Sequence, residues 1–125
     1  MEYENLDLEV GKEQPPIEAK KVNVVALEER DVKDKDGKDV GVKLVMKVKH
    51  PDAGDIELSK VKYEKNKKIT ESGLWLTKDK EGNIPFKSAL ASLLRFNNCT
   101  KLSDLNGKEI DTAIDDNGFI IAKAY

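Results

Sequence analysis

Lysine residues that could contact phosphate groups recur through the middle of this 125-residue chain, close to its single tryptophan. Lysine ammonium groups neutralise backbone phosphates, and exposed aromatic rings stack on unpaired bases. The alternation of apolar and charged residues places these lysines on the outer faces of two predicted strands and in the loop that follows. The candidate binding residues, with one tyrosine among them, are Lys43, Lys47, Lys49, Lys60, Lys62, Tyr63, Lys65, Lys67, Lys68 and Trp75.

Each candidate also has a purely structural interpretation. The lysines could form an ordinary solvated strand face. Trp75 stands between Leu74 and Leu76, which we expect to point inward, so its ring either forms a stacking platform or packs locally against the fold or a partner. Tyr63 shares its phase with Val61 and could instead be a core residue whose hydroxyl reaches water.

Residue types for other chemistries are few. The chain has one histidine, His50, and one cysteine, Cys99, too few for a zinc ligand set or an internal disulfide. No glycine-rich phosphate loop is present, and neither residue has a recognisable catalytic partner in the sequence. The acidic run at 115–117 lacks the twelve-residue spacing of a calcium loop and indicates a turn. We therefore expect a protein that is not an enzyme and uses no metal or cofactor.

The net charge of the chain limits the ways in which it could bind nucleic acid. The formal net charge is -2 although 37% of the residues are charged, so phosphate contacts must come from a local patch and not from overall charge. A hydrophobic fraction of 38% supports a folded core. No apolar run follows Met1, so the sequence predicts no export signal and no membrane span. We therefore expect a cytoplasmic location.

Pro15 and Pro16 mark the expected boundary between an acidic flexible arm, residues 1–16, and a folded domain, residues 17–125. Proline resists helix and removes a backbone donor. The arm could shield the lysines, imitate nucleic acid or dock on a basic partner, or it could be a solvated tail.

Strand patterns follow this boundary. Apolar residues alternate from Ile17 with a phase change near Lys20, which predicts a bulged first strand. An Asp-Gly turn within residues 34–39 leads to the clearest strand, and a third strand over residues 56–63 has a phase slip near Ser59. The apolar face of the second strand consists of Val40, Val42, Leu44, Met46 and Val48.

Residues 85–96 carry the one strong helical pattern, with Asn83 as the expected N-cap and Pro85 in the first turn. An Asp-Asn-Gly turn at 115–118 then joins two final strands. All three phenylalanines, Phe86, Phe96 and Phe119, are expected to lie in the core.

The order strand, strand, strand, helix, strand, strand predicts a mainly β fold with one α-helix, a five-stranded OB-fold-like barrel. Other small α+β sheets share this order. The stretches PFKSALASLLRF and LSDLNGKEIDTAIDDNGFIIAKAY resemble the C-terminal half of a phage-encoded and archaeal-virus-like family of single-strand-binding OB-fold proteins. In that family a helix is followed by an L-x-GK turn, here Leu105, Gly107 and Lys108, and by a final hairpin. The resemblance in layout covers most of residues 17–125.

We therefore predict non-enzymatic, sequence-tolerant binding of single-stranded DNA, or of RNA, in replication, recombination or repair of a virus or mobile element. One alternative is a protein-interaction or inhibitor module of viral or archaeal origin that uses the acidic arm and the Trp75 region against a replication or host protein. Another is an accessory domain that acts only within an enzyme complex. Convergence of the lysines in space would favour the first prediction.

Overall fold

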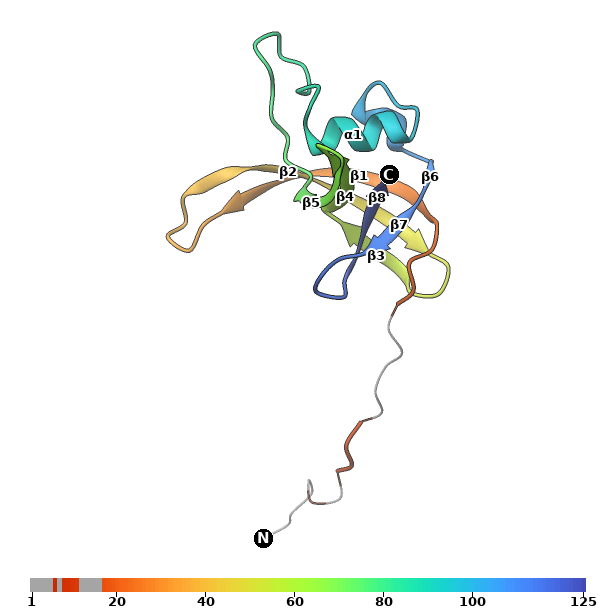
Figure 1. The fold of residues 1–125 in the computed structure, drawn as a ribbon. Coiled ribbons are helices and arrows are strands. Elements are labelled where there is room, and N and C mark those ends of the chain that lie inside the picture. Colours follow the sequence, from red (N-terminus) through yellow and green to blue (C-terminus); the bar gives the residue numbers. More distant parts are fainter. Residues whose placement is uncertain (1–5, 7, 12–16) are drawn as a thin grey trace.

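A computed structural model describes residues 6, 8–11 and 17–125 of the chain. These residues form a mainly β fold with one α-helix and two four-stranded sheets, one of them curled into a half-barrel (Figure 1). The strands are β1 (Val22–Lys33), β2 (Asp39–His50), β3 (Gly54–Leu58), β4 (Lys60–Lys65), β5 (Lys68–Gly73), β6 (Glu109–Ile110), β7 (Thr112–Ile114) and β8 (Ile120–Ala124). The helices are α1 (Ala89–Phe96) and the short 3₁₀ helix η1 (Leu102–Leu105).

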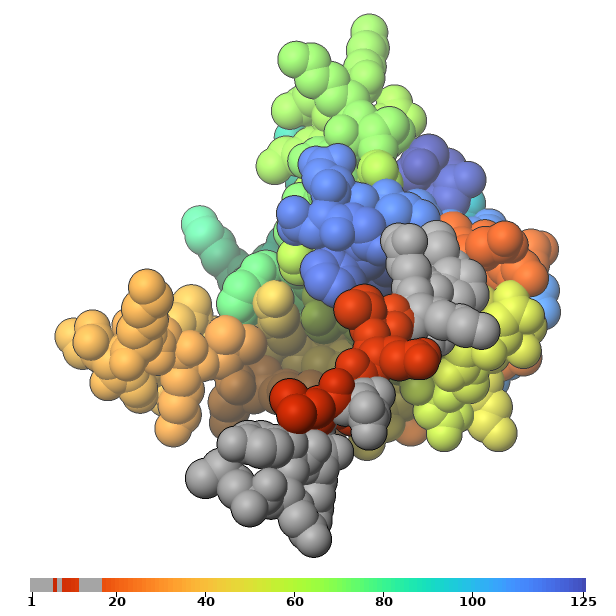
Figure 2. All heavy atoms as spheres, turned by 90° about the horizontal axis from the view of Figure 1, so that it is seen from below, coloured from red at the N-terminus to blue at the C-terminus, as the bar shows by residue number. Residues whose placement is uncertain are grey.

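The first sheet has the order β3-β2-β1-β6 and is built on a long β1–β2 hairpin that projects from the body of the molecule (Figure 2). The predicted Asp-Gly turn closes this hairpin. The Asp34 carboxylate accepts hydrogen bonds from the amides of Asp36 and Lys38, both at 2.9 Å. Gly37 adopts φ 79°, a left-handed conformation that glycine reaches without strain.

The second sheet has the order β5-β4-β8-β7, and β4 runs parallel to β8. Only Ser59 separates β3 from β4, although the two strands belong to different sheets. Likewise only Asp111 separates β6 from β7. The chain therefore passes between the sheets twice without a connecting loop.

These crossings correct the predicted strand count, because the described residues form eight strands and not five. The expected third strand is divided between the sheets at Ser59, whose carbonyl accepts a hydrogen bond from Leu74 at 2.9 Å. The phase slip near Ser59 therefore marks a change of sheet. The β5 strand, in a stretch where no strand was expected, pairs with β4.

The core lies between the two sheets and α1. Leu44, Met46 and Val48 are at most 2% exposed, as the alternation of the second strand predicts. Val40, also expected on this apolar face, is 56% exposed because its part of β2 lies in the projecting hairpin. The predicted core positions of the three phenylalanines are wrong, since all three rings are exposed.

The helix is shorter than predicted. It begins at Ala89, and Ser88 is its N-cap, with an Oγ that accepts a hydrogen bond from Ala91 at 3.1 Å. Asn83 is therefore not the cap, and Pro85 precedes the helix, where its carbonyl accepts from the Ser88 amide. Leu90 and Leu93 are buried, which fixes the face that packs on the sheets.

The first strand begins at Val22 and not at Ile17. Its pairing with β2 has register shifts between Val24 and Ala26 and between Val32 and Lys33, and none near Lys20. The segment before it is held in place by the Lys20 carbonyl, which accepts from the Thr112 hydroxyl at 2.6 Å. The predicted arm, residues 1–16, falls mostly outside the described residues. Among the described residues, no helix combines the length and the apolar character needed to cross a membrane.

The His50 side chain stabilises the end of β2 through hydrogen bonds to neighbouring backbone groups. Its ring is 3% exposed, with Nε2 2.7 Å from the Glu18 carbonyl oxygen. Nδ1 accepts hydrogen bonds from the amides of Asp52 at 3.0 Å and Ala53 at 3.1 Å. Because Nδ1 is an acceptor, Nε2 carries the proton and donates to Glu18. His50 is thus a structural residue that joins the β2–β3 turn to the segment before β1.

Replacing His50 with alanine removes the acceptor of two amides and the donor to Glu18. We expect His50→Ala to lower the free energy of unfolding by about 1–3 kcal/mol, the usual cost of leaving such groups without partners. Urea unfolding followed by circular dichroism would measure the change. Lys49→Ala, at the exposed neighbouring position, is the matched control, and equal unfolding midpoints for the two variants would contradict this role of His50.

Candidate binding surface

Residues 74–76 extend the first sheet beyond the end of β3. The amide of Leu44 donates to the Leu74 carbonyl and the amide of Leu76 donates to the Val42 carbonyl, both at 2.8 Å. Trp75 is thereby paired with Lys43 of β2. Leu74 is fully buried, as predicted, whereas Trp75 and Leu76 are both intermediate in exposure, and Leu76 packs against the core.

The Trp75 indole is held by a cation and by two glycines. The Lys43 ammonium lies 4.8 Å from the ring centroid, within the range of a cation–π interaction. A β-carbon at Gly41 would lie 3.2 Å from the ring, and one at Gly73 would lie 2.9 Å from its Nε1. The ring therefore lies against the backbone at both glycines, and a larger residue at Gly73 would displace it.

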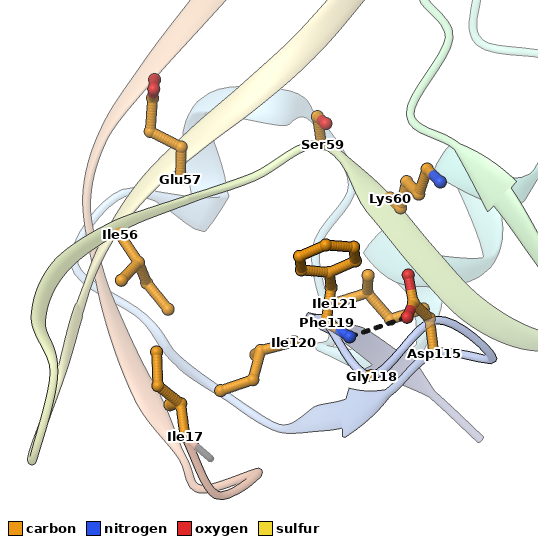
Figure 3. A pocket seen from close by; sticks show the side chains of 10 residues that line it. All are labelled: Ile17, Ile56, Glu57, Ser59, Lys60, Asp115, Gly118, Phe119, Ile120 and Ile121. Atoms are coloured by element: carbon orange, nitrogen blue, oxygen red, sulfur yellow. Dashed lines mark hydrogen bonds between the residues drawn. The ribbon is translucent and has the colours of Figure 1, made fainter. Parts of the chain in front are cut away.

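A groove of about 400 Å³ separates β3 from β8 (Figure 3). It opens because β8 pairs with β4 only from Val61 and Ala122 onward, whereas β3 pairs with β2. Aliphatic side chains from three segments approach one another in it: Ile17, Ile56 and Ile120. Its mouth is lined by Ser59, Lys60 and Phe119.

The Phe119 ring is 69% exposed and stands at this mouth, opposite Ser59 in Figure 3. The buried Asp115 carboxylate fixes the turn before it by accepting hydrogen bonds from the amides of Asn117 at 2.9 Å and Phe119 at 2.8 Å. Phe119 was expected in the core and is a surface residue. The signal available was its place directly after Gly118, at the end of a tight turn.

Lys60 lies between the groove and the segment that carries Trp75. It lines the groove together with Phe119, and in the β4–β5 pair it lies opposite Gly73, which packs against Trp75 and Lys43. We call this area around the Ser59 crossing the junction surface. It comprises Lys43, Lys60, Trp75 and Phe119.

The other predicted lysines of β2 are offset by acids. Lys47 lies 3.7 Å from the Glu28 carboxylate and opposite Glu57 of β3. Lys49 lies opposite Asp55. This part of the β2 face therefore carries little net positive charge.

An arginine strengthens that neutralisation. Arg30 of β1 donates to the carboxylates of Glu28 and Glu57, both at 2.8 Å, across Val45 of β2, which is 3% exposed. The hydrogen bond from Arg30 lowers the pKa of the Glu28 carboxyl. Both acids therefore compete with any phosphate for the cations of this face.

The remaining predicted residues lie elsewhere. Lys62 donates to the Ile114 carbonyl at 3.1 Å. Tyr63 is 6% exposed and packs in the core, which is the structural alternative that its phase with Val61 indicated. The lysines at 65, 67 and 68 surround the exposed β4–β5 turn. At about 3.3 Å per residue, the length of β5 places that turn about 17 Å from Gly73. The predicted lysines do not form one patch.

Cys99 is 6% exposed, and burial raises the pKa of its thiol. A neutral buried thiol is a poor nucleophile. Within the part of the chain that the structure describes, no group of three or more histidine, cysteine or acidic residues is arranged to hold a metal ion. The junction surface offers stacking and charge, which suit binding.

No protein-family model, curated protein or solved structure matches this chain. The resemblance to viral single-strand-binding proteins therefore stays a prediction.

The packing of Trp75 can be tested at Gly73. A β-carbon there would lie 2.7 Å from Lys43 Cε and 2.9 Å from Trp75 Nε1. We expect Gly73→Ala to displace the indole and increase its exposure, which would shift tryptophan emission to longer wavelength and increase acrylamide quenching. The signal is specific because the chain has one tryptophan.

Gly11→Ala is the control for this substitution, since a β-carbon at Gly11 meets nothing within 4 Å. An unchanged spectrum for Gly73→Ala would contradict the described contact between the glycine and the indole.

Proposed function

We propose that this protein binds single-stranded nucleic acid, preferentially DNA, on the junction surface and performs no chemistry on it. We also propose that the fold is an OB-like barrel in which β3 with β4 forms the third strand, β6 with β7 forms the fourth, and β5 is an additional strand paired with β4. The parallel β4–β8 pair and the two loop-free crossings support this assignment. In OB folds the outer face around the second and third strands receives single strands.

The observation that carries the proposal is the position of Lys60 between two aromatic residues. Phe119 shares the groove with it, and Trp75 packs on Gly73, its partner across the β4–β5 pair. An extended nucleic-acid strand that crosses Ser59 would contact the exposed Phe119 ring on one side, the Lys60 ammonium in the middle and the Trp75 indole with Lys43 on the other. Each aromatic contact with a base contributes about 1–3 kcal/mol.

The same geometry limits the electrostatic part of binding. Lys43 and Lys60 are the cations of the junction surface, whereas Lys47 and Lys49 face acids. For single strands the logarithm of the affinity falls with the logarithm of salt concentration by about 0.7 per phosphate neutralised. Two phosphate contacts therefore predict a slope of about -1.4. The slope for a protein that used all eight predicted lysines would be several times steeper.

Fluorescence anisotropy of a labelled oligothymidine, titrated at several salt concentrations beside a duplex of equal length, tests the proposal. We expect strand-selective binding that Phe119→Ala weakens about tenfold, because one stacking contact of about 1.4 kcal/mol is lost. Phe86→Ala is the matched control. Phe86 is 75% exposed, but its ring stacks on Arg95 beside the helix, away from the groove.

A second pair of variants tests the charge. Lys60→Met should weaken binding and flatten the salt dependence, while Lys35→Met, in the β1–β2 turn, should leave both unchanged. No binding at low salt, or equal losses for Phe119→Ala and Phe86→Ala, would refute the proposed surface.

A protein-interaction role is the second candidate, and the aliphatic lining of the groove favours it. Ile17, Ile56 and Ile120 suit the side chains of a polypeptide better than phosphates. Binding of a protein partner that Phe119→Ala weakens, together with no affinity for the oligothymidine, would support this role.

A further inference from the structure

The groove has an unpaired strand edge along one wall. β3 is the terminal strand of its sheet, and among the described residues no backbone group pairs with its free edge over 54–58. In an antiparallel pair, alternate residues direct their N–H and C=O groups away from the neighbour. Such an edge, next to an apolar groove, is a template for another extended segment.

The chain itself contains a segment of matching pattern. Leu6, Leu8 and Val10 recur at every second position, with Asp7 and Glu9 between them. In an extended conformation the three apolar side chains would lie on one face and the two acids on the other. The apolar side chains are 75%, 76% and 99% exposed, and residues 6 and 8–11 lie well below the sheets in Figure 1.

We propose that segment 6–10 of one copy adds as a strand to the free edge of β3 in a second copy and places its apolar face in the groove. Its five residues equal the length of β3. Its aliphatic side chains would contact Ile17, Ile56 and Ile120, while Asp7 and Glu9 would face outward, toward the exposed Lys60. Exchange of a segment between copies forms a dimer at low cost.

A second copy satisfies the geometry better than the segment's own groove does. Ile17 already lines the groove, so the chain would have to leave it and return within residues 11–16. Pro15 and Pro16 favour extended backbone on the outward path. An outward run over residues 14–16 covers about 10 Å, and the returning strand must cover the same distance. With a two-residue turn the return would use residues 9–11, so Val10 would stay outside the groove, whereas a second copy accommodates all three apolar residues.

This inference does not depend on nucleic-acid binding, and its test contains no nucleic acid. Light scattering on a size-exclusion column, over a range of protein concentrations, should give a monomer that becomes a dimer as concentration rises. The triple variant Leu6→Ser, Leu8→Ser, Val10→Ser should remain a monomer at every concentration. Val40→Ser, which alters an exposed apolar residue of the projecting hairpin, should dimerise as the natural chain does.

Two further measurements locate the contact. Amide hydrogen exchange at residues 54–58 should slow as the natural chain dimerises and stay constant in the triple variant. A labelled peptide of residues 2–11 should bind the triple variant, whose groove is intact and unoccupied by its own strand.

Equal masses for the natural chain and the triple variant would overturn the proposal. So would a dimer without protection at 54–58. A natural chain that stays monomeric while the peptide binds the triple variant would also overturn it, by placing the segment in the groove of its own copy.

Discussion

The chain crosses from one sheet to the other at Ser59, and this crossing sets the positions of the groove and of the segment that carries Trp75. β3 is bound to β2 and β4 is bound to β8, so the residues on the two sides of Ser59 are held in different sheets. The sheets must diverge below this point, and the groove is the space that results. Leu58 and Val61 stay buried through the crossing, which keeps a continuous core between the sheets.

The crossing also explains why the tryptophan is available. With β3 ended at Leu58, the adjoining part of the β2 edge is free to pair with residues 74–76, and the Ser59 carbonyl fastens this segment through the Leu74 amide. The alternation that buries Leu74 directs Trp75 outward beside Lys43. The groove with the exposed Phe119 ring and the segment with Trp75 and Lys43 therefore both adjoin Ser59. The acids that bind Arg30 also offset Lys47, so the neighbouring part of the β2 face carries little net positive charge.

Local patterns in the sequence predicted the elements that depend on local physics. The alternation of Leu44, Met46 and Val48 identified the buried face of β2, and the Asp-Gly turn of the first hairpin followed from its side-chain chemistry. The helix was located, although its start was misplaced because Pro85 and Asn83 are plausible beginnings until Ser88 is seen to cap it. The phase slip at Ser59 was visible in the sequence. A bulge and a change of sheet produce the same phase slip in the alternation of apolar residues, so the sequence does not distinguish them.

The candidate surface was less predictable, because pairing between distant segments decides it. Nothing in the sequence indicates that Lys47 and Lys49 lie opposite Glu57 and Asp55, or that Lys60 adjoins Phe119. Tyr63 was left between two interpretations, and its phase with Val61 favoured the core position that it occupies. Phe119 was expected in the core, whereas the turn at Asp115 holds its exposed ring at the mouth of the groove.

The most direct test of the central claim is a map of amide chemical-shift changes in the isotope-labelled protein on addition of an oligothymidine. We expect the largest changes at residues 43, 59–60, 73–75 and 118–119, with none in the β4–β5 turn or in α1. Changes centred on Lys65, Lys67 and Lys68, or none at all, would contradict it.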